Sequence, residues 1–301
     1  MKTRLKSTIL PLLAAFIWGT AFVAQKANTA GALTFNAARS LVAFPFLLIL
    51  ILIFTKGDYK HILSEESKED TKALWTGGVL CGLALASATF FQQYGMDHGT
   101  EAGKAGFITA LYIVLVPVMG LFLKKKAGWN IWLAVLFAVT GLYFLCIKQG
   151  ASVRPSDLSV LVCAFLFAVQ IHLIDHYSVH CNCIKLSCVQ FLTSFVVSGI
   201  GALIFEEISL PALSGSILPI LYLGIFSSGI AYTLQMVAQK GANPSVVSVL
   251  MSMESVFSVL SGAVILHERL TGREYIGCLI MFFAVMLTEI NWKKKPQHTA
   301  A

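Results

Sequence analysis

The chain has 301 residues, a formal net charge of +7, 12% charged residues and 57% hydrophobic residues. Soluble domains carry about 25% charged residues, and a soluble chain of this length cannot bury so much apolar surface. The composition excludes an ordinary soluble enzyme or binding module and indicates a protein that is solvated by lipid. No basic helix or basic-aromatic patch suggests nucleic acid, so we attribute the positive charge to membrane topology and to anionic lipid.

Apolar runs that are long enough to cross a hydrocarbon core of about 30 Å recur along the chain. We expect ten transmembrane helices, which cover residues 9–25, 33–55, 73–96, 105–123, 127–147, 158–174, 186–205, 208–239, 244–266 and 272–292. The eighth run is too long for one span, and Pro211 and Pro219 predict that its first part is a loop. The first run is longer than a signal-peptide core, so we expect it to remain as a helix.

Basic side chains gather on one side of this topology, and such side chains favour the cytoplasm. If the N-terminus is cytoplasmic, that side holds most of the basic residues, among them Lys2, Arg4, Lys6, Lys124, Lys125, Lys126 and residues 293–295. We therefore expect both termini to be cytoplasmic and the chain to be a multi-pass protein of the cell membrane.

The two halves of the chain resemble each other. "LLAAFIWGTAFVAQK" matches "LVCAFLFAVQIHLID", "GLALASATFFQQYGMDHG" matches "GIFSSGIAYTLQMVAQKG" without a gap, and "WNIWLAVLFAVTG" matches "REYIGCLIMFFAV". We predict two repeats of five helices, over residues 9–148 and 157–291. Because five is an odd number, the second repeat enters the membrane from the opposite side. Inverted repeats are typical of alternating-access carriers, whose substrate site lies near the midplane between the repeats.

The chain also resembles a known family. The motifs "AFIWGTAFVAQK", "TEAGKAGFITALYIVLVPVMGLFLKKK" and "MSMESVFSVLSGAVILHERLTGREYIGCLIMFFAV" are similar, in their order and spacing, to those of EamA-type members of the drug/metabolite transporter superfamily. The resemblance implies a secondary carrier, often an exporter of amino acids or other metabolites, with a cavity between the repeats. In the family the ninth helix has a proline after its glutamate, whereas here Ser255 follows Glu254.

Glu254 is the acidic side chain that the pattern places deepest in the membrane. A carboxylate at that depth costs at least about 2.5 kcal/mol and is a functional-site hypothesis by default. Ser258 and Ser261 share its helix face, where small hydroxyl residues allow a close helix contact or line a cavity. Two interpretations stay open: a protonatable group in a substrate or proton pathway, or a fixed bond between two helices.

Arg39 is the basic residue inside a predicted span. It could meet a substrate carboxylate or pair with an acidic side chain such as Glu101. We favour a structural pair, or an arginine that reaches the membrane interface.

Amide and aromatic side chains suggest a binding cavity. Gln93 aligns with Gln235 between the repeats, and each follows an aromatic residue, Phe90 or Tyr232, by one helical turn. Amides cannot face lipid unsatisfied, and an aromatic-walled cavity with a few polar groups is the usual small-molecule site. The predicted site residues are Trp18, Gln93, Tyr94, Tyr112, Gln170, His172, Tyr232, Gln235 and Glu254, with Gln25 and Gln92 as further amides. Ordinary helix packing is the alternative for each of them.

The cysteines and histidines form no recognisable metal or redox pattern. The loop "DHYSVHCNC" contains His176, His180, Cys181 and Cys183, but the spacing matches no structural zinc site. His172 and Asp175 precede it and could relay protons or mark the interface. We expect no metal and no cofactor.

Enzymatic motifs are not found: the chain lacks His-Glu-x-x-His, Gly-x-Ser-x-Gly and a phosphate-binding Gly-Lys-Ser/Thr loop. We therefore expect no enzyme, and a secondary transporter that exports a small metabolite, an amino acid or related compound, by alternating access. The alternative is a non-transporting membrane sensor or scaffold. The expected partners are a small-molecule substrate and the lipid bilayer, with protons as a candidate coupling ion, a homodimer as a candidate assembly, and no nucleic acid.

Overall fold

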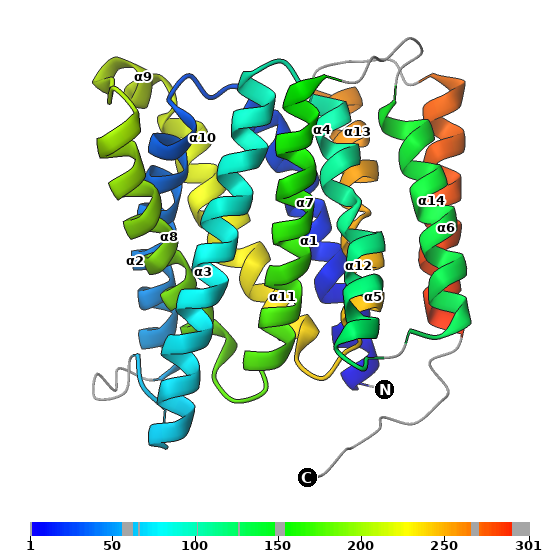
Figure 1. Cartoon of the computed structure of the whole chain (residues 1–301), viewed down its shortest axis with the longest axis horizontal. Coiled ribbons are helices and arrows are strands. Elements are labelled where there is room, and N and C mark those ends of the chain that lie inside the picture. Colours follow the sequence, from blue (N-terminus) through cyan, green and yellow to red (C-terminus); the bar gives the residue numbers. More distant parts are fainter. Residues whose placement is uncertain are drawn as a thin grey trace.

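The computed structural model describes residues 2–55, 63–65, 67–100, 102–125, 127–147, 154–265 and 271–290, and these residues form helices and connections without a strand. Figure 1 shows one bundle, with the start of α1 and the end of α14 at the same, lower end. The elements are α1 (Lys2–Lys26), α2 (Ala32–Phe54), α3 (Lys68–Asp97), α4 (Ala102–Ala110), α5 (Tyr112–Phe122), α6 (Trp129–Cys146), α7 (Pro155–Tyr177), α8 (Cys183–Phe205), α9 (Leu210–Gly215), α10 (Ile217–Tyr222), the π-helix η1 (Leu223–Ala231), α11 (Tyr232–Gln239), α12 (Pro244–Met251), α13 (Glu254–Ile265) and α14 (Gly272–Ile290).

Many of these helices are long and apolar enough to cross a membrane. Within the described part of the chain there are eight such segments: Ala32–Phe54, Lys68–Asp97, Lys104–Phe122, Trp129–Cys146, Pro155–Tyr177, Cys183–Phe205, Ile217–Gln239 and Pro244–Ser261. A shorter apolar helix covers Ser7–Ala21. The fold is therefore that of a multi-pass helical membrane protein, and the count of ten spans stays a prediction. The segment expected to be a loop around Pro211 contains the short helix α9.

Two long helical segments are interrupted near their middle, one between α4 and α5 and the other between α12 and α13. At the first interruption the Leu111 N–H donates to the carbonyl oxygen of Ile108, and at the second the Met253 N–H donates to that of Leu250. Each bond joins residues three apart, so a tighter turn replaces one α-helical turn. The second interruption forms without a proline. There the Ser252 hydroxyl donates to the Val249 carbonyl at 2.7 Å, a contact that bends helices.

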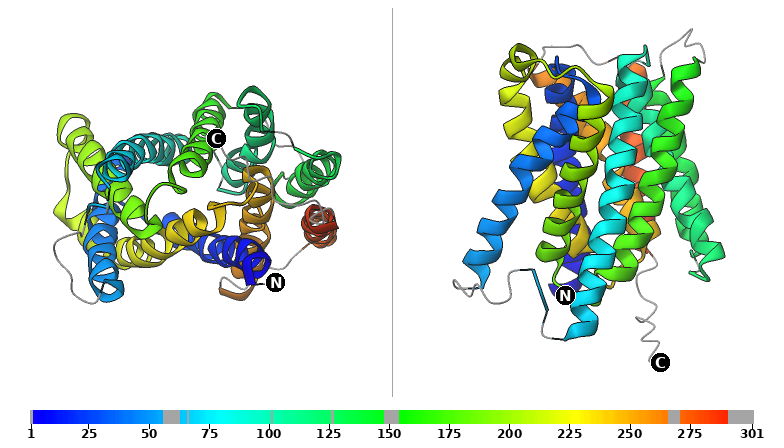
Figure 2. Two further views of the ribbon diagram at one scale, coloured as in Figure 1. Left: turned by 90° about the horizontal axis from the view of Figure 1, so that it is seen from below. Right: turned by 60° about the vertical axis from the view of Figure 1, so that its left-hand side comes forward.

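Helices from the two halves of the chain pack against each other. α6 contacts α14, α2 contacts α8, α3 contacts α7 and α8, and α1 contacts η1, α11 and α13. Figure 2 shows α6 and α14 side by side at one edge of the bundle and α2 and α8 at the opposite edge. The helices between these two edges surround the middle of the bundle, where the cavity described below lies.

The contact between α2 and α8 is polar along its length. The Asn36 amide donates to the Ser198 hydroxyl at 2.7 Å, and the hydroxyls of Ser40 and Ser194 lie 3.1 Å apart. All four side chains are buried. These bonds set the rotation of α2 about its axis, because Asn36 and Ser40 are one turn apart and must both face α8.

Two carboxylates accept hydrogen bonds from backbone N–H groups at the N-termini of α2 and α8. Glu206 follows α8 and accepts hydrogen bonds from the backbone N–H groups of Leu33 and Thr34 in α2, each at 2.8 Å. Glu65 follows α2 and accepts one from the backbone N–H of Asn182, the N-cap of α8, at 2.8 Å. A carboxylate is favourable at a helix N-terminus, where unpaired N–H groups carry partial positive charge.

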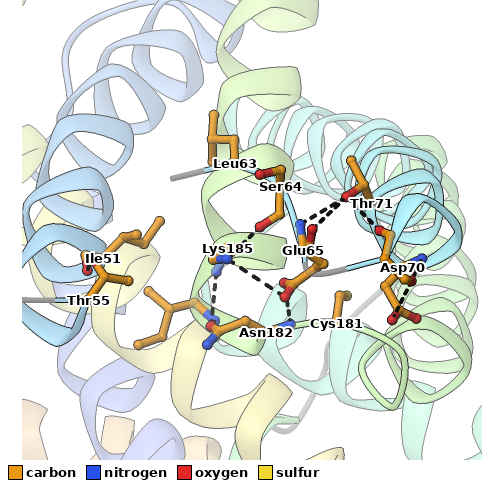
Figure 3. Close-up of polar contacts among 12 residues, drawn as sticks. Ile51, Thr55, Leu63, Ser64, Glu65, Asp70, Thr71, Cys181, Asn182 and Lys185 are labelled. Carbon is orange, nitrogen blue, oxygen red and sulfur yellow. Dashed lines mark hydrogen bonds and ion pairs between the residues drawn. The ribbon is translucent and has the colours of Figure 1, made fainter. Parts of the chain in front are cut away.

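Figure 3 shows the contacts around Glu65. The Lys185 ammonium lies 3.7 Å from the Glu65 carboxylate and donates to the Ser64 carbonyl at 2.5 Å. The Thr71 hydroxyl accepts from the Glu65 N–H at 2.9 Å. The described residues 63–65 are therefore attached to both α3 and α8.

Glycines allow the closest helix contacts. A Cβ atom at Gly82 of α3 would lie 2.6 Å from the Gln190 carbonyl oxygen of α8, and one at Gly224 of η1 would lie 2.9 Å from the Arg39 carbonyl oxygen of α2. No real Cβ approaches backbone so closely. The two glycines are aligned in the predicted repeats. Gly82 brings α3 against α8, and Gly224 brings η1 against α2.

We expect Gly82→Ala to destabilise the protein by about 1–3 kcal/mol, the usual effect of overpacking. Gly199→Ala in α8 is the matched control, because a Cβ there would have no neighbour within 4 Å. The control should leave stability unchanged or raise it by up to about 1 kcal/mol, since alanine is the better helix former. Thermal unfolding in detergent measures both effects, and equal midpoints for the two variants would contradict the close α3–α8 contact.

Candidate functional site

A cavity of about 580 Å³, open solvent included, lies between helices from both halves of the chain. Its lining combines aromatic walls with amide, hydroxyl and charged groups: Trp18, Ala21, Gln25, Arg39, Thr89, Gln92, Thr109, Tyr112, Phe167, Gln170, Ile171, Ser227, Tyr232, Gln235, Met251 and Glu254.

Aromatic side chains form the walls of the cavity. The ring centroids of Trp18 and Tyr232 lie 4.9 Å apart, with the planes inclined by 62°. Phe167 of α7 is the residue that the sequence aligns with Trp18 of α1, and both line the cavity. Helices α1 and α7, which the predicted repeats pair with each other, therefore present corresponding aromatic residues to the same space.

Glu254 lies at the middle of the bundle, where the second interrupted helix resumes. It is the first residue of α13 and is 7% exposed. The Tyr112 hydroxyl, from the first residue of α5, donates to its carboxylate at 3.5 Å. That distance is the limit of a hydrogen bond. The Glu254 carboxyl group is therefore only weakly held by the protein and can accept a further donor.

The helix that begins with Glu254 makes a close contact with α1. A Cβ atom at Gly19 of α1 would lie 2.8 Å from both the Glu254 carbonyl oxygen and the Ser258 backbone nitrogen. Ser258 therefore lies at a close helix contact. Neither Ser258 nor Ser261 lines the cavity.

Arg39 lines the cavity although its side chain is almost completely buried, with 4% exposed. Its Nε atom has no hydrogen-bond partner, and its guanidinium interacts with the Tyr232 hydroxyl. The expectation that Arg39 reaches the membrane interface is wrong, because α2 is rotated so that Asn36 and Ser40 face α8 and Arg39 faces the cavity. Its proposed partner Glu101 lies outside the described residues, and no described carboxylate forms an ion pair with it.

Six of the nine predicted site residues line the cavity: Trp18, Tyr112, Gln170, Tyr232, Gln235 and Glu254. Gln93, Tyr94 and His172 do not. Gln93 donates to Asp97 at 3.0 Å, and its neighbour Gln92 lines the cavity instead and donates to Thr109 at 3.1 Å. A rotation of about 100° per residue separates the two amides.

The other two residues also have structural contacts. Tyr94 is 39% exposed and stacks on His98, with ring centroids 3.9 Å apart. The Nε2 atom of His172 lies 2.9 Å from the Val116 carbonyl oxygen of α5. Seven further residues line the cavity and were not predicted: Ala21, Thr89, Thr109, Phe167, Ile171, Ser227 and Met251. Of these, Phe167 could have been found from its alignment with Trp18.

Two of the residues that line the cavity come from helix ends: Gln25 is near the end of α1, and Gln92 is in the last part of α3. Figure 1 shows these helix ends in the upper part of the bundle. Ile171 and Met251, which also line the cavity, belong to one apolar cluster with Val116 and Val247. The Gln239 amide donates to the Ile171 carbonyl at 3.3 Å.

Ion pairs reinforce the contact of α4 and α5 with α7 at both ends. Lys104 pairs with Asp157 at the upper end, and Lys125 pairs with Asp175 at the lower end. Partial burial lowers the pKa of Lys125. Asp175, a candidate for proton relay, is therefore engaged in an ion pair.

The histidines and cysteines of the loop after α7 form no metal site in the structure. In the described part of the chain, no three His, Cys, Asp or Glu side chains are close enough together to hold a metal ion. Cys181 and Cys183 are buried among Leu74, Leu186 and neighbouring apolar side chains. Burial raises the pKa of the Cys181 thiol to about 12, which disfavours the thiolate that binds metals.

Comparisons with known proteins agree with this architecture. The model of the EamA-like transporter family matches residues 5–147 and again residues 154–290. An uncharacterized transporter of Archaeoglobus fulgidus is 30% identical over 288 residues, which cover 93% of this chain and 84% of the relative. The uncharacterized transporter YoaV of Bacillus subtilis is 22% identical over 288 residues, 93% of this chain and 95% of that protein. A crystal structure of another protein shares the fold, with a TM-score of 0.78 over 94% of this chain and 96% of the other, at 17% identity.

The bonds of the cavity and those between packed helices should differ in their effect on stability. Tyr112→Phe removes a bond at the distance limit, so we expect a loss below about 1 kcal/mol. Ser198→Ala removes the partner of the buried Asn36 amide at 2.7 Å, so we expect a loss of about 1–3 kcal/mol. Thermal unfolding of both variants in detergent checks the difference. A larger loss for Tyr112→Phe would show that the Tyr112–Glu254 bond holds the bundle together.

Proposed function

The chain belongs to the EamA-like transporter family, and on that premise we propose that it is a secondary transporter that exports a small metabolite by alternating access. Members of this family are transporters and not enzymes. The proposed substrate is an amino acid or a related compound, and the proposed location is the cell membrane. The observation that carries the proposal is the cavity, which is lined from both halves of the chain by aromatic, amide and charged side chains.

We propose that the transporter has ten spans arranged as two inverted repeats. The same family model matches both halves of the chain. The two helix interruptions carry the same type of backbone bond at aligned positions, Leu111 and Met253. Gly99 and Gly241, also aligned, both adopt positive φ, at 103° and 81°. Figure 1 shows α1 and α7 running in opposite directions, as an inverted repeat requires.

The packing of the helices supports the same arrangement. A twofold exchange of the halves pairs α1 with α7, α2 with α8, and α3 with the segment α10–η1–α11. Under that exchange the contacts of α3 with α7 and α8 become contacts of η1 and α11 with α1 and α2. Contacts of α1 with η1 and α11, and of α2 with η1, are present.

We propose that the cavity opens on the side of Gln25 and Gln92, which is the outside if both termini are cytoplasmic. This would be one state of an alternating-access cycle. The opposite state would require helix contacts at the other end to separate, among them the Gln239–Ile171 bond. Protons are the coupling ion that we propose, with Glu254 as the group that carries them.

Flux in proteoliposomes tests the transport proposal. Reconstituted protein should accumulate at least one amino acid or related compound when a pH gradient is imposed. Glu254→Gln should reduce pH-driven flux at least about tenfold, because an amide cannot exchange a proton. Glu207→Gln, which changes an exposed carboxylate after α8, is the control and should keep wild-type flux.

Two outcomes would contradict parts of this proposal. Intact pH-driven flux in Glu254→Gln would make Glu254 a structural residue. If no amino acid, nucleoside or cationic compound moved, transport itself would lose its support.

A membrane sensor or scaffold without transport is the second candidate. Cysteine labelling separates the two, because Gln235 lines the cavity and its aligned partner Gln93 does not. In a transporter, Gln235→Cys should react with a small membrane-impermeant thiol reagent, and the side from which it reacts should change when substrate is added. Gln93→Cys is the matched control and should stay unreactive. Failure of Gln235→Cys to react from either side would favour the scaffold.

A further inference from the structure

Arg39 has no carboxylate partner among the described residues, although its side chain is buried. Lys185, which is also buried, is paired with Glu65, and the less buried Lys104 and Lys125 have carboxylate partners as well. Arg39 is more buried than Lys185, with 4% exposed against 8%. A buried charge without a counter-charge is strongly unfavourable. The Arg39 guanidinium therefore lacks the partner that its surroundings require.

The side chains around Arg39 leave room for that partner in the cavity. Arg39 interacts with the Tyr232 hydroxyl, a neutral group that does not compensate its charge. Its Nε atom has no partner, and neither do Trp18 Nε1 and Gln235 Oε1. All three side chains line the cavity. Unpaired donors and acceptors that converge on one space indicate that a ligand completes their hydrogen bonds.

The backbone explains why Arg39 is held in this place. Its neighbours Asn36 and Ser40 are bonded to α8, and Glu206 holds the start of α2. The absence of a side chain at Gly224 brings η1 against the Arg39 carbonyl oxygen. α2 and η1 are therefore close together, and Arg39 lies beside Tyr232 in the lining of the cavity. These contacts position the Arg39 side chain before a ligand binds.

We propose that Arg39 and Tyr232 form a carboxylate-binding subsite, and that the substrates of this protein carry a carboxylate group. The inference rests on the proposed transport function and names the chemical class of its substrate. A planar guanidinium binds a carboxylate through two parallel hydrogen bonds, and the charge makes each of them stronger than a neutral bond. The Tyr232 hydroxyl adds a third donor. Glu254, whose charge also acts on Tyr232, adds an acid to the lining of the same cavity.

Matched pairs of ligands test the subsite on the purified full-length chain in detergent. The probes are the common amino acids and their carboxamides at millimolar concentration, which differ only in the carboxylate. At least one amino acid should raise the unfolding temperature. Its carboxamide should bind about ten- to a hundred-fold more weakly, the effect of losing a charge-assisted hydrogen bond.

Variants assign the preference to Arg39. Arg39→Gln should remove the preference for the acid over the amide, and Arg39→Lys should retain part of it because the charge remains. The control is Arg273→Gln, which removes a guanidinium stacked on Tyr143 and Phe144 outside the cavity and should behave as wild type. If Arg39→Gln does not fold, Arg39→Lys and the wild-type acid-to-amide ratio decide.

Three results would overturn the subsite: carboxamides that bind as tightly as the acids, an unchanged acid preference in Arg39→Gln, or no stabilisation by any amino acid. Flux from a total metabolite extract in proteoliposomes separates this inference from the transport proposal. Carboxylate binding through Arg39 without any flux would refute transport and keep the subsite. Flux confined to compounds without an anionic group would support transport and refute the subsite.

Discussion

Hydrocarbon offers no water to a polar side chain, so each polar group in a membrane-spanning helix needs a partner within the protein or in a ligand. Much of this structure follows from that constraint. Asn36 donates to Ser198 and Gln170 donates to Gln190 across helix contacts. Arg39, Trp18 and Gln235 keep an atom without a partner, and all three line the cavity. These three atoms are therefore open to a hydrogen bond with a ligand in the cavity.

Interruption of two helices is what allows a carboxyl group to lie at the centre of the bundle. Tyr112 and Glu254 each begin a half-helix, at the point where the regular backbone bonds are broken. The partial positive charge of a helix N-terminus favours an acid at that position. Serine side chains that bond to the preceding turn bend the second helix without a proline. Its bend therefore does not depend on the proline that the family usually has after this glutamate.

The α2–α8 pair shows how packing and chemistry depend on each other. Serine and asparagine contacts fix the rotation of α2, and a glycine in η1 allows a close approach from the other side. Together they direct the arginine of α2 into the cavity. Long basic side chains usually extend toward the interface when they can. Here the contacts of α2 with α8 and η1 direct Arg39 into the cavity instead.

The sequence predicted a helical membrane protein and its family, and six of the nine site residues predicted from it line the cavity. These predictions depend on hydrophobic length, on repeat alignment and on the cost of polar groups in lipid, which are local or pairwise properties of the chain. It could not predict which of two adjacent amides faces the cavity, since Gln92 and Gln93 have the same chemistry and differ only by helix rotation. Nor could it place Phe167 or Ser227, whose residue types are common in ordinary helix contacts.

Arg39 shows most clearly what the sequence could determine and what it could not. Sequence alone determined that a charged residue lies within a span and needs a partner. Only the tertiary structure decided that the partner is not a described carboxylate and that the side chain faces the cavity. The reason is that the direction of a side chain depends on the rotation of its helix, and that rotation is set by contacts with α8 and η1, which are far away in the sequence.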